Sequence, residues 1–146
     1  MSKFHFYHPV DVRYGDLDPQ WHVNNTRFLN YLEDARIAYI MNLSLWDGQS
    51  FLDLGTILAD THIAYLSPIV FGEKIRVGVR VASIGNKSLK FEYQIENAEN
   101  GEIKAKAETV QVAYDYAAKT SRRVPDEWRE KITQFEQGGQ DAAAGG

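Results

Sequence analysis

Apolar and polar residues alternate with two different periods along the chain, and the change of period marks its elements. In residues 4–14 the even positions are mostly apolar and the odd positions mostly polar, which predicts a half-buried strand. In residues 26–43 apolar residues recur every three or four positions instead, which predicts a long amphipathic helix. The central stripe of this helix consists of Phe28, Leu32, Ala35 and Tyr39.

The predicted helix has a broad apolar face and a narrower polar face. Four residues are expected to widen the buried stripe: Leu29, Tyr31, Ala38 and Met41. Four others are expected on the polar face: Asn30, Glu33, Asp34 and Arg36. Glu33 and Arg36 are one turn apart, so we expect them to pair on the surface. Asn24, Asn25 or Thr26 can cap the start of the helix.

Four runs with the period of a strand follow the helix: 56–66, 74–84, 89–95 and 102–116. Gly85-Asn86 and Asn100-Gly101 lie between consecutive runs and predict tight hairpin turns. In the last run the apolar positions change from odd to even, which predicts a bulge near Glu108 or Thr109. Residues 124–135 predict a short terminal helix with Pro125 in its first turn.

One strand, one long helix and four consecutive strands indicate an α+β fold in which a single sheet covers a single helix. The length of 146 residues suggests one domain, which we assign to residues 1–136. Residues 137–146 contain few large apolar groups, so we expect a disordered tail.

Composition narrows the classes of function. The net charge is -4, which argues against nucleic acid as the main partner. The chain has no cysteine, so thiol catalysis and cysteine-ligated zinc are excluded. No apolar run has the roughly 18–20 residues that span a membrane, and no signal-peptide pattern is present. We therefore expect a cytoplasmic protein without a membrane span.

The connector at residues 14–25, with the sequence YGDLDPQWHVNN, carries the candidate chemistry. It places Asp18 and His22 just before a helix whose first amide groups, near Asn24 or Asn25, are free to bind an anion. Such amides can stabilise an oxyanion. A nearby carboxylate can act as a general base or as a nucleophile, and these residues leave both routes open.

Residues 12–36, VRYGDLDPQWHVNNTRFLNYLEDAR, resemble the N-terminal motif of the hotdog-fold acyl-thioester hydrolases, in particular the 4-hydroxybenzoyl-CoA thioesterase-like branch. The HVNN within it resembles the acyl-carrier-protein thioesterases. Residues 62–95 are similar to the later part of the family pattern, so that the resemblance covers about residues 8–117. It implies a hotdog fold, with a long central helix wrapped by an antiparallel sheet of about five strands.

The resemblance also implies roles for single residues. It assigns the catalytic carboxylate to Asp18 and the amide that holds the thioester carbonyl to Asn25, and His22 matches the histidine of the acyl-carrier-protein branch. Gln20 stands where that branch has an asparagine, so an asparagine-dependent mechanism is not expected. Asp16 is expected to have a structural role in the turn.

The implied activity is hydrolysis of acyl-CoA, or acyl-carrier-protein, thioesters without a cofactor. The implied active sites lie at the interface of a homodimer or homotetramer whose subunits join their sheets edge to edge. Asn24 and Tyr65 are candidates for the acyl pocket. Basic and polar residues are candidates for contact with the coenzyme A phosphates: Lys87, Ser88, Lys90, Arg122 and Arg123.

Other interpretations of the same residues remain open. GDLDPQWH is similar to the signature of hotdog enoyl-CoA hydratases, but Asp18 replaces its asparagine and one extra residue separates Asp16 from His22. A non-catalytic acyl-CoA-binding protein is a third hypothesis. A metal site at Asp16, Asp18 and His22 is not expected, because no second histidine is near. Glu33 is an alternative acid on the helix.

Overall fold

The computed structural model describes residues 3–50 and 54–138. Its strands are β1 (Phe6–Val10), β2 (Thr56–Tyr65), β3 (Ile75–Ile84), β4 (Ser88–Asn97), β5 (Ile103–Asp115) and β6 (Thr120–Ser121). Its helices are a short 3-10 helix η1 (Tyr14–Asp16), the long α1 (Asn25–Asn42) and the terminal α2 (Asp126–Gly138). The predicted order of one strand, one long helix and four strands is confirmed.

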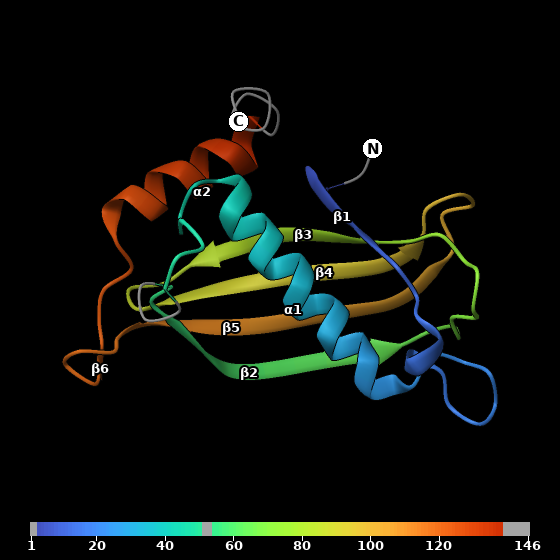
Figure 1. The fold of residues 1–146 in the computed structure, drawn as a ribbon. Helices are drawn as coiled ribbons and strands as arrows, with labels where there is room; N and C mark the ends of the chain where they lie inside the picture. The colour runs from blue at the N-terminus through green and yellow to red at the C-terminus, as the bar shows by residue number, and fades with distance from the viewer. Residues whose placement is uncertain (1–2, 51–53, 139–146) are drawn as a thin grey trace.

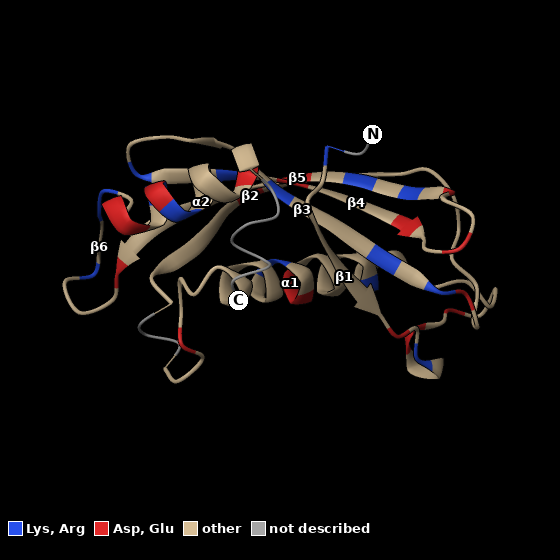
Figure 2. Cartoon of the chain, turned by 90° about the horizontal axis from the view of Figure 1, so that it is seen from above, with Lys and Arg blue, Asp and Glu red and all other residues tan. Residues whose placement is uncertain are grey.

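The strands form one antiparallel sheet with the order β1-β3-β4-β5-β2, and β6 adds a short pair to β5. Helix α1 crosses one face of this sheet, which we call the inner face (Figure 1). Figure 2 shows the same two layers from the side, with α1 beneath the strands. This α+β arrangement is the hotdog architecture that the sequence resemblance implied.

The helix prediction is right in extent and wrong at three side chains. Phe28, Leu32, Ala35 and Tyr39 are all buried, as predicted. Leu29 and Met41, expected to be buried, are exposed. Arg36, expected on the polar surface with Glu33, is buried instead and donates from Nη1 to the hydroxyl of Tyr93, 3.1 Å away. The sheet covers one flank of α1 more than the other, which helix periodicity cannot indicate.

The first strand is shorter than its pattern suggested. β1 ends at Val10, and the chain then turns into η1, where Tyr14 is exposed rather than buried. β1 forms one edge of the sheet and pairs only with β3. Pro9 suits this edge because it has no N–H to donate to a neighbouring strand.

The bulge predicted near Glu108 or Thr109 is not found at that position. β5 stays in register with β4 from Ala105 to Val112, and its odd positions continue to face inward, including the buried Thr109 and Gln111. The register shifts lie elsewhere: at Lys104 of β5, where Ile95 and Glu96 of β4 pair with Ala105 and Ile103, and in β2 between Leu58 and Asp60. The apparent phase change arose because two polar residues occupy the inner face of β5 while two valines face outward.

The outer face of the sheet is charged. Arg76 pairs with Glu96, and Arg80 and Lys3 both pair with Glu92. In Figure 2 the basic and acidic residues are interspersed along the strands rather than gathered in one stripe. In the part of the chain that the structure describes, no helix is long and apolar enough to cross a membrane.

α2 packs at the C-terminal end of α1 (Figure 1). The ring of Phe135 meets that of Tyr39 at a centroid distance of 5.7 Å, and the Tyr39 hydroxyl donates to Glu136 over 2.5 Å. The predicted terminal helix is therefore present, but it begins after Pro125 and continues to Gly138. Residues 137 and 138 of the predicted tail are thus helical, and residues 139–146 lie outside the described residues.

Candidate active site

The polar connector folds back on itself before α1 begins. Leu17 forms an antiparallel bridge with Val23, and His22 forms another with Val70. The N–H of Val23 also donates to the carbonyl of Ile69 over 2.8 Å. The connector is therefore attached to the loop between β2 and β3, although that loop lies far along the sequence.

Asp18 holds the turn at the tip of this connector. Its Oδ1 accepts the N–H of Gln20 at 2.8 Å and that of His22 at 3.3 Å. Trp21 closes the turn by donating its N–H to the carbonyl of Asp18, with a left-handed φ of 64° that bulky residues seldom adopt. Oδ2 of Asp18 has no hydrogen-bond partner among the described residues. One carboxylate oxygen thus fixes the loop and the other is free for chemistry.

The start of α1 leaves one amide unused. Asn24 is the N-cap, and its Oδ1 accepts from the N–H of Thr26 at 2.9 Å, as is usual for asparagine at this position. The N–H of Arg27 donates to the carbonyl of Asn24. The N–H of Asn25 has no acceptor among the described residues, so it is the free donor at the positive end of the helix.

Asp18 and Asn25 line the same surface pocket, whose volume is about 550 Å³. His22, Asn24 and Tyr65, all predicted from the sequence, line it as well. Five further lining residues were not singled out from the sequence: Val23, Phe28, Leu66, Ser67 and Pro68. The pocket thus combines a free carboxylate oxygen, a free backbone donor and an apolar wall.

Tyr65 joins β2 to the tip of the helix. Its hydroxyl donates to the carbonyl of Asn25 over 3.1 Å, and its ring lies edge-on to that of Phe28 at 5.1 Å. Tyr65 therefore fixes the direction of the first helical turn and contributes an aromatic surface to the pocket.

Asp16 has the structural position that was expected. Its side chain is 2% exposed, and Oδ2 accepts from the hydroxyl of Tyr31 at 2.8 Å and from the N–H of Arg13 at 3.0 Å. Burial by itself would raise the pKa of Asp16, but these hydrogen bonds and the charges of Arg13 and Arg27 outweigh it and lower the pKa. Asp16, ionised at neutral pH, anchors the connector to α1.

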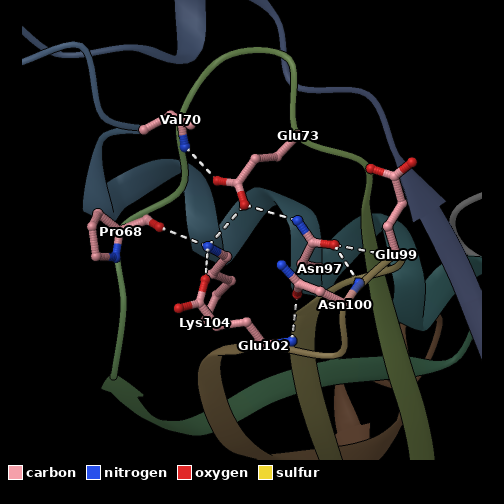
Figure 3. A network of polar contacts seen from close by, with 8 residues as sticks. All are labelled: Pro68, Val70, Glu73, Asn97, Glu99, Asn100, Glu102 and Lys104. Carbon is pink, nitrogen blue, oxygen red and sulfur yellow. Dashed lines mark hydrogen bonds and ion pairs between the residues drawn. The ribbon is translucent and has the colours of Figure 1, made fainter.

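A buried ion-pair network supports the far wall of the pocket (Figure 3). Lys104 is 3% exposed, and its Nζ donates to Glu73, Glu102 and the carbonyl of Pro68 at 2.9, 2.5 and 3.1 Å. The backbone of Lys104 also accepts the N–H groups of Leu66 and Ser67. Its polar position in an alternating strand gave no sign of this role, because two of its partners, Glu73 and Pro68, are distant in sequence.

Glu73 extends the network toward the connector. It accepts from the N–H of Val70 at 2.8 Å and from the side chain of Asn97 at 2.9 Å. Burial would raise the pKa of Glu73, but the hydrogen bonds from Val70, Lys104 and Asn97 and the charge of Lys104 lower it. Because Val70 also pairs with His22, the network reaches the residues beside Asp18.

The candidate phosphate-binding residues lie away from this pocket in a single chain. Ser88 is opposite Val112 of β5, whereas Tyr65 is opposite Ala105. Val112 and Ala105 are seven residues apart on β5, which corresponds to about 23 Å along the strand. Lys87, Lys90, Arg122 and Arg123 are also absent from the residues that line the pocket.

Two further expectations concern acids and metals. Glu33 is exposed on α1 and does not line the pocket, and no ion pair with Arg36 is found in the described part of the chain. Within residues 3–50 and 54–138 no group of three or more histidine, aspartate or glutamate side chains could hold a metal ion.

Comparison with known proteins agrees with this geometry. Residues 12–132 match the family described as the thioesterase-like superfamily. The long-chain acyl-CoA thioesterase FadM of Escherichia coli is 26% identical over 126 residues, which cover 86% of this chain and 96% of FadM. YsmA of Bacillus subtilis is 30% identical over 98 residues, which are 67% of this chain. The match covers 65% of YsmA, so this chain spans a little under two thirds of the length of YsmA.

Among solved structures, a thioesterase from Thermus thermophilus in complex with coenzyme A and zinc is 36% identical to this chain. The superposition covers 94% of this chain and 98% of that one, with a TM-score of 0.83. The pocket at the start of α1 and these matches lead to one conclusion: the chain belongs to the thioesterase-like superfamily.

Proposed function

We propose that this protein hydrolyses acyl-CoA thioesters to the free acid and coenzyme A, with Asp18 and the backbone amide of Asn25 as the reacting pair. The observation that carries the proposal is that Asp18, whose Oδ2 has no partner among the described residues, and Asn25, whose N–H has none, line one pocket. The similarity to an acyl-CoA thioesterase and to a thioesterase with bound coenzyme A supports the choice of substrate.

In the proposed reaction the thioester carbonyl oxygen accepts a hydrogen bond from the N–H of Asn25. Negative charge develops on that oxygen, and the positive end of α1 stabilises it. The Asn24 cap keeps the other early amides occupied, so the Asn25 amide is the one available to the substrate.

Asp18 delivers the attacking oxygen by one of two routes. As a base it takes a proton from water, the hydroxide adds to the carbonyl carbon, and the carbon–sulfur bond breaks as the thiolate recovers the proton. As a nucleophile it forms a mixed anhydride and releases the thiolate, and water then hydrolyses the anhydride. His22 borders the same pocket and serves to orient the water or the carboxylate.

The open edge of the sheet at β2 supports a homodimer, in which a second copy of the chain pairs with this edge. β2 is an open edge that presents the exposed Leu58 and no proline, and unprotected edges favour pairing with another strand. Two β2 strands that pair across a two-fold axis run antiparallel. The end of one sheet that carries Lys87 and Ser88 then lies toward Tyr65 of the other chain.

Release of free thiol from a panel of acyl-CoAs tests the proposal, with aromatic groups and alkyl chains of several lengths and one acyl-carrier-protein thioester. Asp18→Asn is expected to lower kcat by about 10²–10⁴-fold, as for the loss of a catalytic base, and to keep ligand affinity. The matched control is Asp34→Asn, which changes an exposed acid on α1.

Three results would contradict the proposal. Full activity in Asp18→Asn would remove this carboxylate from the mechanism. Loss of the alkene of crotonyl-CoA without thiol release would indicate a hydratase. Binding of acyl-CoA with no turnover in the unaltered protein would indicate a binding protein.

A further inference from the structure

Arg36 is a buried cation without an acidic partner. It lies at the start of the fourth turn of α1 and is 9% exposed. Its one recorded hydrogen bond runs from Nη1 to the hydroxyl of Tyr93, and within the described residues no carboxylate pairs with it. Taking a guanidinium out of water is costly unless its remaining N–H groups find acceptors. An apolar side chain at position 36 would fill the same space without this desolvation cost, so packing alone does not account for an arginine.

The neighbours of Arg36 also offer donors rather than acceptors. The Tyr93 hydroxyl, which accepts from Arg36, also shares a hydrogen bond with Oγ1 of Thr109, 2.6 Å away, in which either group can be the donor. In either direction, one hydroxyl hydrogen of this pair has no acceptor among the described residues. Gln111 lies two residues after Thr109 on β5. It is 3% exposed, and its Nε2 has no hydrogen-bond partner among the described residues. This donor cluster consists of Arg36, Tyr93, Thr109 and Gln111.

The donor cluster lies on the same flank of the helix as the proposed thioester site. Arg36 follows Asn25 by eleven residues, which is about three turns and 16 Å of helix. The contact with Tyr93 and Thr109 shows that this flank faces β4 and β5. The Arg36 side chain leans back toward the start of α1, as helical side chains do.

The donor cluster can be approached from the side of β2. Leu58 is opposite Gln111 and Thr61 is opposite Thr109, so both side chains point to the inner face. Both are exposed, Leu58 by 51%. The inner face beside the cluster is therefore not covered by the chain itself.

We propose that the acyl group of the substrate runs from Asn25 along this flank of α1 and ends in a carboxylate that the donor cluster binds. A carboxylate offers two acceptor oxygens that match the fork of a guanidinium. The inference rests on the proposed thioester hydrolysis and adds the substrate class: ω-carboxyacyl-CoA of medium chain length.

Paired substrates of equal length test this specificity. Thiol release is measured for octanoyl-CoA against suberyl-CoA, and for decanoyl-CoA against sebacyl-CoA. The unaltered protein is expected to favour the carboxylate-ended member in kcat/KM by about tenfold or more, the usual worth of a hydrogen-bonded charge. In Arg36→Met the advantage is expected to vanish, while octanoyl-CoA hydrolysis persists.

Arg36→Lys, which keeps the charge without the fork, is expected to give an intermediate preference. Arg80→Met, which removes an arginine on the outer face, is the matched control and is expected to leave the ratio unchanged. Calorimetric binding of free suberate against octanoate provides a readout that needs no turnover. Suberate that binds more tightly than octanoate to the unaltered protein, but not to Arg36→Met, supports the cluster even if no thioester is cleaved.

Several outcomes would overturn the inference. One is an unaltered protein that treats both members of each pair alike in turnover and in binding, a result that does not require the variant to fold. Another is an equal loss for both members in Arg36→Met, which would assign Arg36 to the core or to a subunit contact. Hydrolysis of the alkyl substrates alone would leave the proposed function intact and remove the carboxylate preference.

Discussion

The two ends of α1 have opposite surroundings. At the N-terminal end Asn24 caps the helix, yet the amide of Asn25 remains free beside a pocket. At the C-terminal end α2 covers the helix. There Phe135 packs on Tyr39, and Glu136 accepts both the Tyr39 hydroxyl and the N–H of Val81.

The difference shows how one helix provides both stability and reactivity. The C-terminal end buries aromatic surface, and burial raises the pKa of Glu136. The N-terminal end leaves the N–H of Asn25 and Oδ2 of Asp18 without partners among the described residues, and these two groups are the donor and the carboxylate of the proposed reaction. Substitutions at the two ends should therefore separate into effects on stability and effects on turnover.

The largest effect is expected at the covered end. Phe135→Ala removes a fully buried ring and should lower the free energy of unfolding by about 3–5 kcal/mol. The specific activity of the folded fraction should change little, because Phe135 is remote from the pocket. Urea titration measures the first quantity and thiol release under native conditions the second. A strong loss of activity without a loss of stability would contradict the assignment of this end of α1 to stability rather than turnover.

Asn25→Pro tests the free amide at the open end. Proline is well suited to the first helical position, and Asn24 already has the extended ψ of 136° that proline prefers in the residue before it. The fold should therefore persist, while loss of the oxyanion donor raises the barrier by about 2.7–4 kcal/mol.

The control for that variant is Asn25→Ala, which removes the side chain and keeps the N–H. We expect Asn25→Ala to retain most of kcat and Asn25→Pro to lose about 10²–10³-fold. Equal activities for the two variants would show that the amide does not hold the carbonyl.

Asp16→Asn separates anchoring from catalysis at the open end. Loss of the charge between Arg13 and Arg27 should lower the free energy of unfolding by about 1–3 kcal/mol at neutral pH. The pKa of Asp16 is held below its ordinary value of 3.8 in the folded state, so its contribution is present above about pH 4 and is lost as the pH falls through the folded value. Urea titrations between neutral pH and pH 3 should show the two proteins converging, and a constant difference would argue against a charge effect.

The smallest effect is expected from Asn24→Ala. Loss of the cap to Thr26 should cost about 1 kcal/mol of stability, and thermal unfolding measures it. Asn24→Asp keeps the capping oxygen and should restore the stability. A restored stability with a lowered kcat in Asn24→Asp would indicate that the added charge acts on the oxyanion.

The sequence by itself determined the elements and half of the residues that line the candidate pocket. The periods of two and of about 3.6 located the strands and α1, since the alternation of buried faces is local. Asp18, His22, Asn24 and Asn25 were found because a carboxylate, a histidine and a helix cap lie within one short connector. Tyr65 came from the family resemblance and from its place in a strand.

Only the tertiary structure decided how distant segments meet. β2 lies beside β5 at the far edge rather than beside β3, since strand pairing depends on the packing of the whole sheet. Arg36 was expected on the surface, yet it is buried and donates to Tyr93 of β4. Lys104, at a polar position of its strand, is buried as well and pairs with Glu73 from the loop before β3. Local patterns report which face a residue occupies, but only the packed chain determines whether a charge on that face finds a counter-ion, a phenol or an open pocket.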